Sequence, residues 1–206
     1  MTREKQIILT ARVVSMLFTP FYLPLLGMIV LLFMTYLNRY PTSYKFLVLA
    51  VVYFFTILLP TFLIHFYRRY QGWTLIDLGQ KERRMVPYII SILCYFTCVY
   101  VMEQMHIPHF IGSIVIAALL IQMVCAIINV WWKISTHMAA IGGLAGALFI
   151  FSEVFRFNPL WWFCLVIFLA GILGTSRMIL RQHTLPQVVV GFLVGFVCAF
   201  IGILKL

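Results

Sequence analysis

The chain has 206 residues, of which 64% are hydrophobic and 10% are charged, and its mean hydropathy is +1.07. This composition excludes a soluble globular protein and predicts an integral membrane protein. The formal net charge of +10 comes from 15 Lys and Arg residues against 5 Asp and Glu residues. In such a chain we expect membrane lipids, and no nucleic acid, as partners.

Long apolar segments follow one another along the chain. A helix needs roughly 20 mostly apolar residues to cross a membrane, and seven segments reach or approach that length. The third is the least certain, because its run "YIISILCYFTCVYVM" has only fifteen residues, so six spans stay an alternative. The predicted spans are residues 14–36, 46–66, 86–103, 109–131, 137–154, 159–175 and 187–204.

The opening "MTREKQIILTAR" carries charges ahead of an apolar stretch. It lacks a small-residue cleavage site before a mature domain, so we interpret it as a retained cytoplasmic anchor rather than a removed signal. Because the spans leave almost no polar domain, residues 1–206 are expected to form a single integral membrane domain.

Backbone groups in hydrocarbon must be hydrogen-bonded within the protein, which leaves a helical bundle or a closed barrel. The sequence lacks the alternation of barrel strands. The predicted fold class is therefore all-α, a polytopic transmembrane helical bundle of six to seven spans. Small residues at four-residue spacing, Gly142 with Gly146 and Gly191 with Gly195 and Ala199, predict close helix packing.

The potential metal ligands form no convincing cluster. All five cysteines fall inside apolar spans without the paired spacing of a zinc or redox site, so we interpret them as small core residues. His106 and His109 lie three residues apart on a connector, but two ligands without a carboxylate or thiolate do not make a metal site. We expect neither a metal nor another cofactor.

Eleven of the fifteen basic residues fall on the side of the membrane that also holds the N-terminus. The positive-inside rule alone explains this asymmetry if that side is cytoplasmic. The alternative is an anion site at the helix mouths, since helix N-termini favour phosphate and Arg can hold its oxygens in a fork. Thr184 is expected to cap the last helix, with Pro186 in its first turn. The polar groups that accompany the charges are Ser135, Thr136, His137, Ser176 and His183.

Two motifs in this region resemble signatures of the type 2 phosphatidic acid phosphatase and vanadium haloperoxidase superfamily. "SRMILRQH" is similar to the third signature, Ser-Arg-x5-His-x3-Asp, with Ser176, Arg177 and His183 in register. "ISTH" is similar to the second, Pro-Ser-Gly-His, with Ser135 and His137 matching. The resemblance covers a phosphatase-like core of about residues 81–204.

The first signature of the family, Lys-x6-Arg-Pro, is only loosely echoed by "KERRMVPY". When its Pro is placed on Pro87, Val86 stands where Arg is expected. Lys81, Arg83 and Arg84 therefore match by type and not by spacing, although Lys81 and Arg84 would share one face of a helix.

The resemblance implies a chemistry that an imidazole can perform. His183 would attack the phosphorus and form a phosphohistidine, and His137 would protonate the leaving alkoxide and then activate water. Phosphate oxygens would be held by a set of cationic and hydroxyl side chains: Arg177, Ser135, Thr136, Ser176, Lys81, Arg83 and Arg84.

Gln187 stands where the family has an aspartate. Its amide oxygen can accept the hydrogen bond that orients His183, but it brings no charge to stabilise the imidazolium. Gln187 is therefore a third candidate catalytic residue, and a slower phosphatase, one that uses another acid such as Asp77, and an inactive relic all stay open.

The function implied by the resemblance is a lipid phosphate phosphatase that acts on a phosphomonoester or diphosphate. Phosphatidic acid, phosphatidylglycerol phosphate and a polyprenyl diphosphate are the candidate substrates, because each has its head at the interface. The alternative is a weak or inactive homologue that binds or carries lipid phosphates. A haloperoxidase is disfavoured, since the chain has no large polar domain.

The sequence gives arguments for a site at the cytoplasmic leaflet and for a site at the outer leaflet. When the basic residues that are candidate phosphate ligands are left out, seven basic residues remain on the side of the membrane that holds the N-terminus and the site. Four lie on the opposite side, and this excess favours a cytoplasm-facing site. Many bacterial members of the resembled family instead act on the outer leaflet. We expect a multi-pass protein of the cell (inner) membrane with a cytoplasm-facing site, while a monomer and a homo-oligomer stay equally open.

Overall fold

The computed structural model describes residues 3–34, 36–72 and 85–204. These residues form helices and no strand, which confirms the predicted all-α class. A short 3-10 helix η1 (Tyr36–Arg39) and a π-helical turn η2 (Phe54–Leu58) accompany the α-helices. The α-helices are α1 Arg3–Leu17, α2 Tyr22–Met34, α3 Thr42–Tyr53, α4 Leu59–Gln71, α5 Met85–Gln104, α6 His109–Trp131, α7 Thr136–Phe155, α8 Leu160–Ile179 and α9 Leu185–Leu204.

Six helical segments within the described residues are long and apolar enough to cross a membrane. One of them is the continuous run from α3 through η2 to α4, Thr42–Gln71, and the others are α5 to α9. The widened turn η2 lies just ahead of Pro60, whose ring would otherwise clash with the preceding turn. The helices are those of a multi-pass membrane protein, with α1 and α2 as a seventh span if that bent pair counts as one.

The irregular span is the first and not the third. Residues 14–36 do not form one helix, because α1 ends at Leu17 and α2 begins at Tyr22 with a bend of 59° between them. Pro20 lies in this break, where it removes a backbone donor and disfavours helix at the residue before it. The third span, α5, is a regular helix of 20 residues, because Met85–Val86–Pro87 supply the extra turn.

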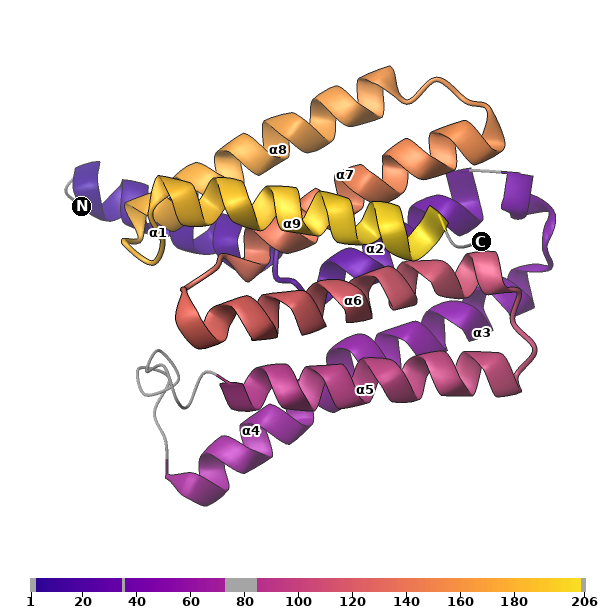
Figure 1. The fold of residues 1–206 in the computed structure, drawn as a ribbon, viewed down its shortest axis with the longest axis horizontal. Coiled ribbons are helices and arrows are strands. Elements are labelled where there is room, and N and C mark those ends of the chain that lie inside the picture. The colour runs from indigo at the N-terminus through magenta and orange to yellow at the C-terminus, as the bar shows by residue number, and fades with distance from the viewer. Residues whose placement is uncertain (1–2, 35, 73–84, 205–206) are drawn as a thin grey trace.

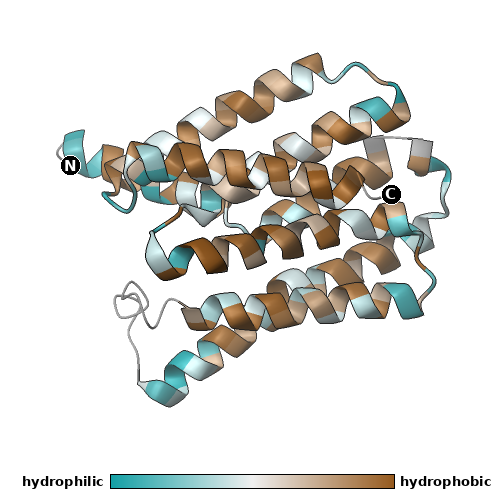
Figure 2. Cartoon of the chain, in the orientation of Figure 1, coloured by the Kyte–Doolittle hydropathy of each residue, from teal (hydrophilic) through white to brown (hydrophobic). Residues whose placement is uncertain are grey.

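The described polar segments gather at one end of the bundle. Figure 1 shows the start of α1, the end of α4, the α6–α7 connection and the α8–α9 connection at the same end. The α5–α6 and α7–α8 connections and the C-terminal end of α9 lie at the other. Figure 2 shows hydrophilic residues at both ends and hydrophobic ones between them, as expected of helices that cross a membrane.

Helices α7 and α9 pack unusually closely through glycines. A Cβ added at Gly195 would overlap the backbone carbonyl of Ala139, and one added at Gly142 would overlap that of Phe192. The four-residue spacing of small residues is therefore used for backbone approach, as predicted. This contact holds the first turns of α7 and α9 side by side, where the Ser135 N–H donates to the Gln187 carbonyl at 3.4 Å.

Four of the five cysteines, Cys94, Cys98, Cys125 and Cys198, are buried as expected of small core residues. The prediction is wrong for Cys164, which is exposed. It lies on α8, a helix at the edge of the bundle that buries only one narrow stripe of its surface.

We expect Gly195→Ala to destabilise the protein, because the new methyl group has to push the α7 backbone away. The cost should be about 1–3 kcal/mol, as for other overpacked sites. Gly171→Ala is the matched control, since a Cβ there meets nothing within 4 Å. Thermal unfolding in detergent measures both, and equal midpoints for the two variants would refute the role of the glycine contact.

Candidate active site

The α8–α9 connection brings Arg177 and His183 together through a tight helix ending. The N–H of Gln182 donates to the Arg177 carbonyl at 3.2 Å, and the N–H of Arg181 donates to the Met178 carbonyl at 2.9 Å. This is the paired hydrogen-bond pattern of a Schellman motif. Arg181 occupies its left-handed position with φ of 52°. The chain thus reverses within a few residues, and His183 follows the last turn of α8 directly.

At the start of α9, the Gln187 side chain binds the Thr184 backbone and also holds His183. The Gln187 Oε1 atom accepts the backbone N–H of Thr184 at 3.2 Å, which is one of the two hydrogen bonds of a capping box. The same Oε1 lies 3.2 Å from the Nδ1 atom of His183. The structure therefore places Gln187 against the imidazole, at the position where the resembled family has an aspartate.

This shared oxygen fixes the tautomer of His183. An atom that accepts a backbone N–H must be the carbonyl oxygen of the amide and not its nitrogen. Because an amide oxygen only accepts, Nδ1 of His183 has to carry the proton of the hydrogen bond. In the neutral imidazole the lone pair then lies on Nε2, which is the atom a nucleophile needs.

Arg177 is held from the other side by the first helix. Its Nη1 donates to the hydroxyl of Ser15 at 2.5 Å, and Ser15 is buried in α1. The Nε atom of Arg177 is also buried, and no residue in the described part of the chain bonds to it. The guanidinium is therefore fixed in place while one of its donors stays unused.

The second histidine lies in the first turn of α7. Arg177 and His183 are close enough to act electrostatically on the His137 imidazole, which also contacts the backbone of Ser15. The Nδ1 atom of His137 is buried and lacks a hydrogen-bond partner among the described residues. The structure thus brings together the two histidines and the arginine that the motifs single out.

The N-cap of α7 adds a third unused polar atom. Ser135 is fully buried, its side chain makes no capping bond, and its Oγ has no partner within the described ranges. An unsatisfied buried polar group costs about 1–3 kcal/mol. Three of them around one helix N-terminus, on Ser135, His137 and Arg177, are the arrangement expected of a site that awaits an anion.

Two cavities open around Arg177, and the guanidinium forms part of both walls. One has a volume of about 390 Å³ and is lined by Thr136, Arg177 and His183. The other lies between α1 and the end of α8, and His137 lines it together with Arg177 and Ser15. His183 and His137 thus line different cavities, and Arg177 lines both.

Some of the predicted phosphate ligands are not placed at the site. Ser176 is buried against α1, and its hydroxyl donates to the Ile172 carbonyl of its own helix at 2.8 Å. Lys81, Arg83, Arg84 and Asp77 lie outside the described residues.

Three residues around the site were missed by the sequence analysis. Ser15 has no motif, and nothing in the sequence relates it to Arg177. Lys133 and Asn129 line the cavity that contains His183. Lys133 precedes His137 by only four residues in "WKISTH", and this spacing is the signal that could have identified it.

Part of the chain matches a known protein family. Residues 130–205, from the end of α6 through α9, match the sequence model of the PAP2 superfamily. The matched segment contains both motifs and all three of Arg177, His137 and His183. No curated protein and no solved structure matches the chain. The C-terminal part of the chain is therefore similar to the PAP2 superfamily over residues 130–205, which is less than half of its length.

Proposed function

We propose that this protein is a membrane-embedded lipid phosphate phosphatase that works through a phosphohistidine on His183. One observation carries the proposal: Gln187 Oε1 binds both the Thr184 N–H and Nδ1 of His183, which leaves the lone pair on Nε2. A histidine held in this tautomer beside a fixed arginine is a nucleophile presented to an anion.

In the first step, Nε2 of His183 attacks the phosphorus of the lipid phosphate. The N–P bond forms as the bond from phosphorus to the lipid oxygen breaks, and His137 donates a proton to that oxygen. The imidazole of His183 becomes positively charged, and its Nδ1–H stays hydrogen-bonded to Gln187. In the second step, His137 takes a proton from water, the water oxygen attacks phosphorus, and phosphate leaves as His183 returns to its neutral form.

The charge on the transferred phosphoryl group has several stabilising donors nearby. Arg177 offers the Nε–H that is unused in the structure, and the first turn of α7 offers backbone N–H groups beside the Ser135 hydroxyl. Because Ser15 fixes the guanidinium, little reorganisation is needed when the substrate binds.

The position of the site favours an amphiphilic substrate. The first turns of α7 and α9 lie at the polar end of the bundle, directly beside the apolar belt (Figure 2). Phosphatidic acid, phosphatidylglycerol phosphate and a polyprenyl diphosphate all place a phosphate at that level with a tail in lipid. We propose a site that faces the cytoplasm, because basic residues are in excess at that end.

A second candidate function is a protein that binds or carries lipid phosphates with little turnover. The uncharged Gln187 favours it, because an amide orients the imidazole but does not stabilise its positive charge as a carboxylate does.

We expect His183→Ala and His137→Ala each to abolish phosphate release from lipid phosphates, since they remove the nucleophile and the proton donor. His109→Ala is the matched control, because His109 is exposed at the opposite end of the bundle. The measurement is phosphate release by purified protein from a panel of the three candidate lipids in detergent micelles. Near-normal activity of His183→Ala would rule out the mechanism.

Substitution of Gln187 tests how the imidazole is held. Gln187→Glu keeps the length of the side chain and adds a charge, so kcat should be preserved or raised. Gln187→Leu removes the acceptor, and kcat should fall by about tenfold or more. If turnover is indifferent to both substitutions, a different group orients His183.

We expect Ser15→Ala to raise KM for the lipid phosphate, because Arg177 loses the hydroxyl that fixes its guanidinium. Thr10→Ala is the control on the same helix, since the Thr10 hydroxyl bonds only to the Gln6 carbonyl of its own helix. Steady-state kinetics of both variants decide the matter. Equal KM values would show that α1 does not position the arginine.

A further inference from the structure

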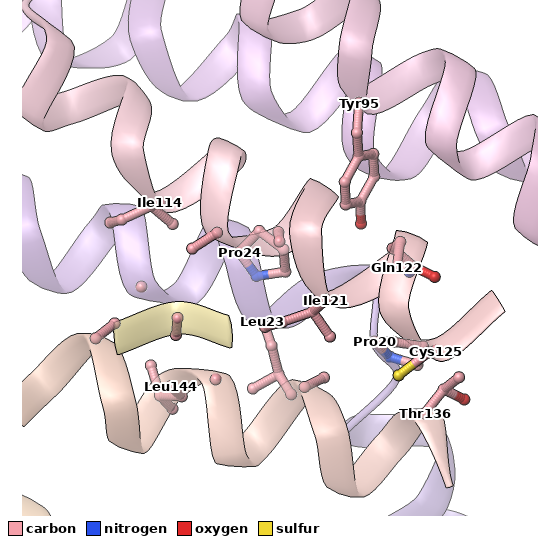
Figure 3. Close-up of a pocket in the computed structure, with 17 residues that line it drawn as sticks. Pro20, Leu23, Pro24, Tyr95, Ile114, Ile121, Gln122, Cys125, Thr136 and Leu144 are labelled. Atoms are coloured by element: carbon pink, nitrogen blue, oxygen red, sulfur yellow. The ribbon is translucent and has the colours of Figure 1, made fainter. Parts of the chain in front are cut away.

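Helix α6, which the structure describes in full, carries three buried polar side chains, and two of them have partners. The Ser113 hydroxyl donates to the Phe110 carbonyl of its own helix at 2.8 Å. The Gln122 side chain is hydrogen-bonded to the Tyr95 hydroxyl of α5, and Figure 3 shows both residues beside the apolar pocket between α2, α6 and α7. The third side chain, Asn129, is only 1% exposed, and its Oδ1 atom has no hydrogen-bond partner among the described residues.

Helix packing does not explain this unpartnered amide. A buried polar group without a partner destabilises a fold, whereas an apolar side chain of the same shape would not. Polar side chains within a span are therefore commonly functional. Asn129 lines the cavity that also contains Arg177 and His183. Its amide is thus unpartnered at the place where a ligand of that cavity could bind to it.

The charges around this cavity favour an anion as the ligand. Three chain segments meet at the cavity of about 390 Å³: Arg177 comes from the last turn of α8, His183 from the α8–α9 connection and Lys133 from the α6–α7 connection. The described residues that line it include no Asp or Glu. Asn129 lies in the last turn of α6, at the polar end of the bundle shown in Figure 1.

We propose that the Asn129 amide is a further ligand of the phosphoryl group and donates from Nδ2 to one of its non-bridging oxygens. The inference rests on the proposed function and deepens it. An amide has two N–H donors beside its oxygen, and its two ends occupy nearly the same volume. A half-turn of the amide therefore presents the donors to an anion without repacking its surroundings.

This ligand differs in origin from those that the motifs supply. Asn129 precedes "ISTH" and lies on α6, whereas the motif residues lie on α7, on α8 and in the α8–α9 connection. Its amide binds a phosphate oxygen from a third helix and adds no charge. A donor that the surrounding helix already holds in place needs little reorganisation as charge develops on the phosphoryl oxygens.

Asn129→Leu separates a ligand role from a structural one. The substitution removes an unsatisfied group, so the unfolding midpoint of the phosphate-free protein in detergent should stay the same or rise. The Kd for inorganic phosphate, taken from the midpoint as a function of phosphate concentration, should rise by about tenfold, the effect of one hydrogen bond to a charged group. Ser113→Ala is the matched control on the same helix, because Ser113 does not line the cavity, and its Kd should not change.

Asn129→Asp tests whether the side chain donates to an anion. An ionised carboxylate only accepts hydrogen bonds and repels phosphate, so near neutral pH the Kd should rise further than in Asn129→Leu. At lower pH the introduced carboxyl takes up a proton and regains a donor. The ratio of the Kd of this variant to that of the unsubstituted protein should therefore fall as the pH falls, which a purely structural role of Asn129 would not produce.

Three results would overturn the inference. They are a failure of the unsubstituted protein to bind inorganic phosphate, an unchanged Kd in Asn129→Leu, and a Kd ratio for Asn129→Asp that does not depend on pH. If Asn129→Leu fails to fold, the pH dependence of Asn129→Asp decides alone.

Binding and turnover distinguish this inference from the proposed function. Phosphate binding that depends on Asn129, without phosphate release from any lipid, supports the inference and contradicts the phosphatase. Phosphate release with the same phosphate Kd in both Asn129 variants contradicts the inference and leaves the phosphatase intact. The His183→Ala protein should still bind inorganic phosphate, and its Kd should rise when Asn129→Leu is added.

Discussion

The close contact between α7 and α9 is the constraint on which the site depends. Gly142 and Gly195 let the two backbones approach so far that any larger side chain would collide with a carbonyl group. The first turns of the helices then lie side by side, with the Ser135 N–H bonded to the Gln187 carbonyl. One helix start presents His137 and the other presents His183, so the spacing of the two histidines follows from helix packing rather than from a loop.

The replacement of a carboxylate by Gln187 changes the electrostatics of the site more than its geometry. The amide oxygen satisfies the Thr184 N–H at the start of α9 and holds Nδ1 of His183 with the same atom. Orientation and tautomer are therefore retained. The proposed mechanism then lacks the negative charge that would favour the imidazolium during phosphoryl transfer, so it assigns a larger share of the stabilisation to Arg177 and the helix N-termini.

The sequence predicts those parts of the structure that depend on local pattern. Hydropathy locates the spans, small-residue spacing predicts close packing of the helices that carry Gly142 and Gly195, and two motifs point to Arg177, His137 and His183. It does not predict the contact of Ser15 with Arg177, because the two residues are 162 positions apart and meet where α1 packs against α8. Nor does it predict that the Ser176 hydroxyl bonds to the Ile172 carbonyl of its own helix, because a motif gives the order of residues and not the face of the helix on which each lies.

The measurement that tests the account most directly is the trapping of the intermediate. Purified protein is mixed with a lipid phosphate labelled on the phosphoryl group, quenched within the first turnovers under alkaline denaturing conditions that preserve phosphohistidine, and digested for mass analysis. The account predicts that the label resides on His183 and is absent from the Gln187→Leu protein or strongly reduced in it. Phosphate release without label on His183, or label on another residue, would contradict it.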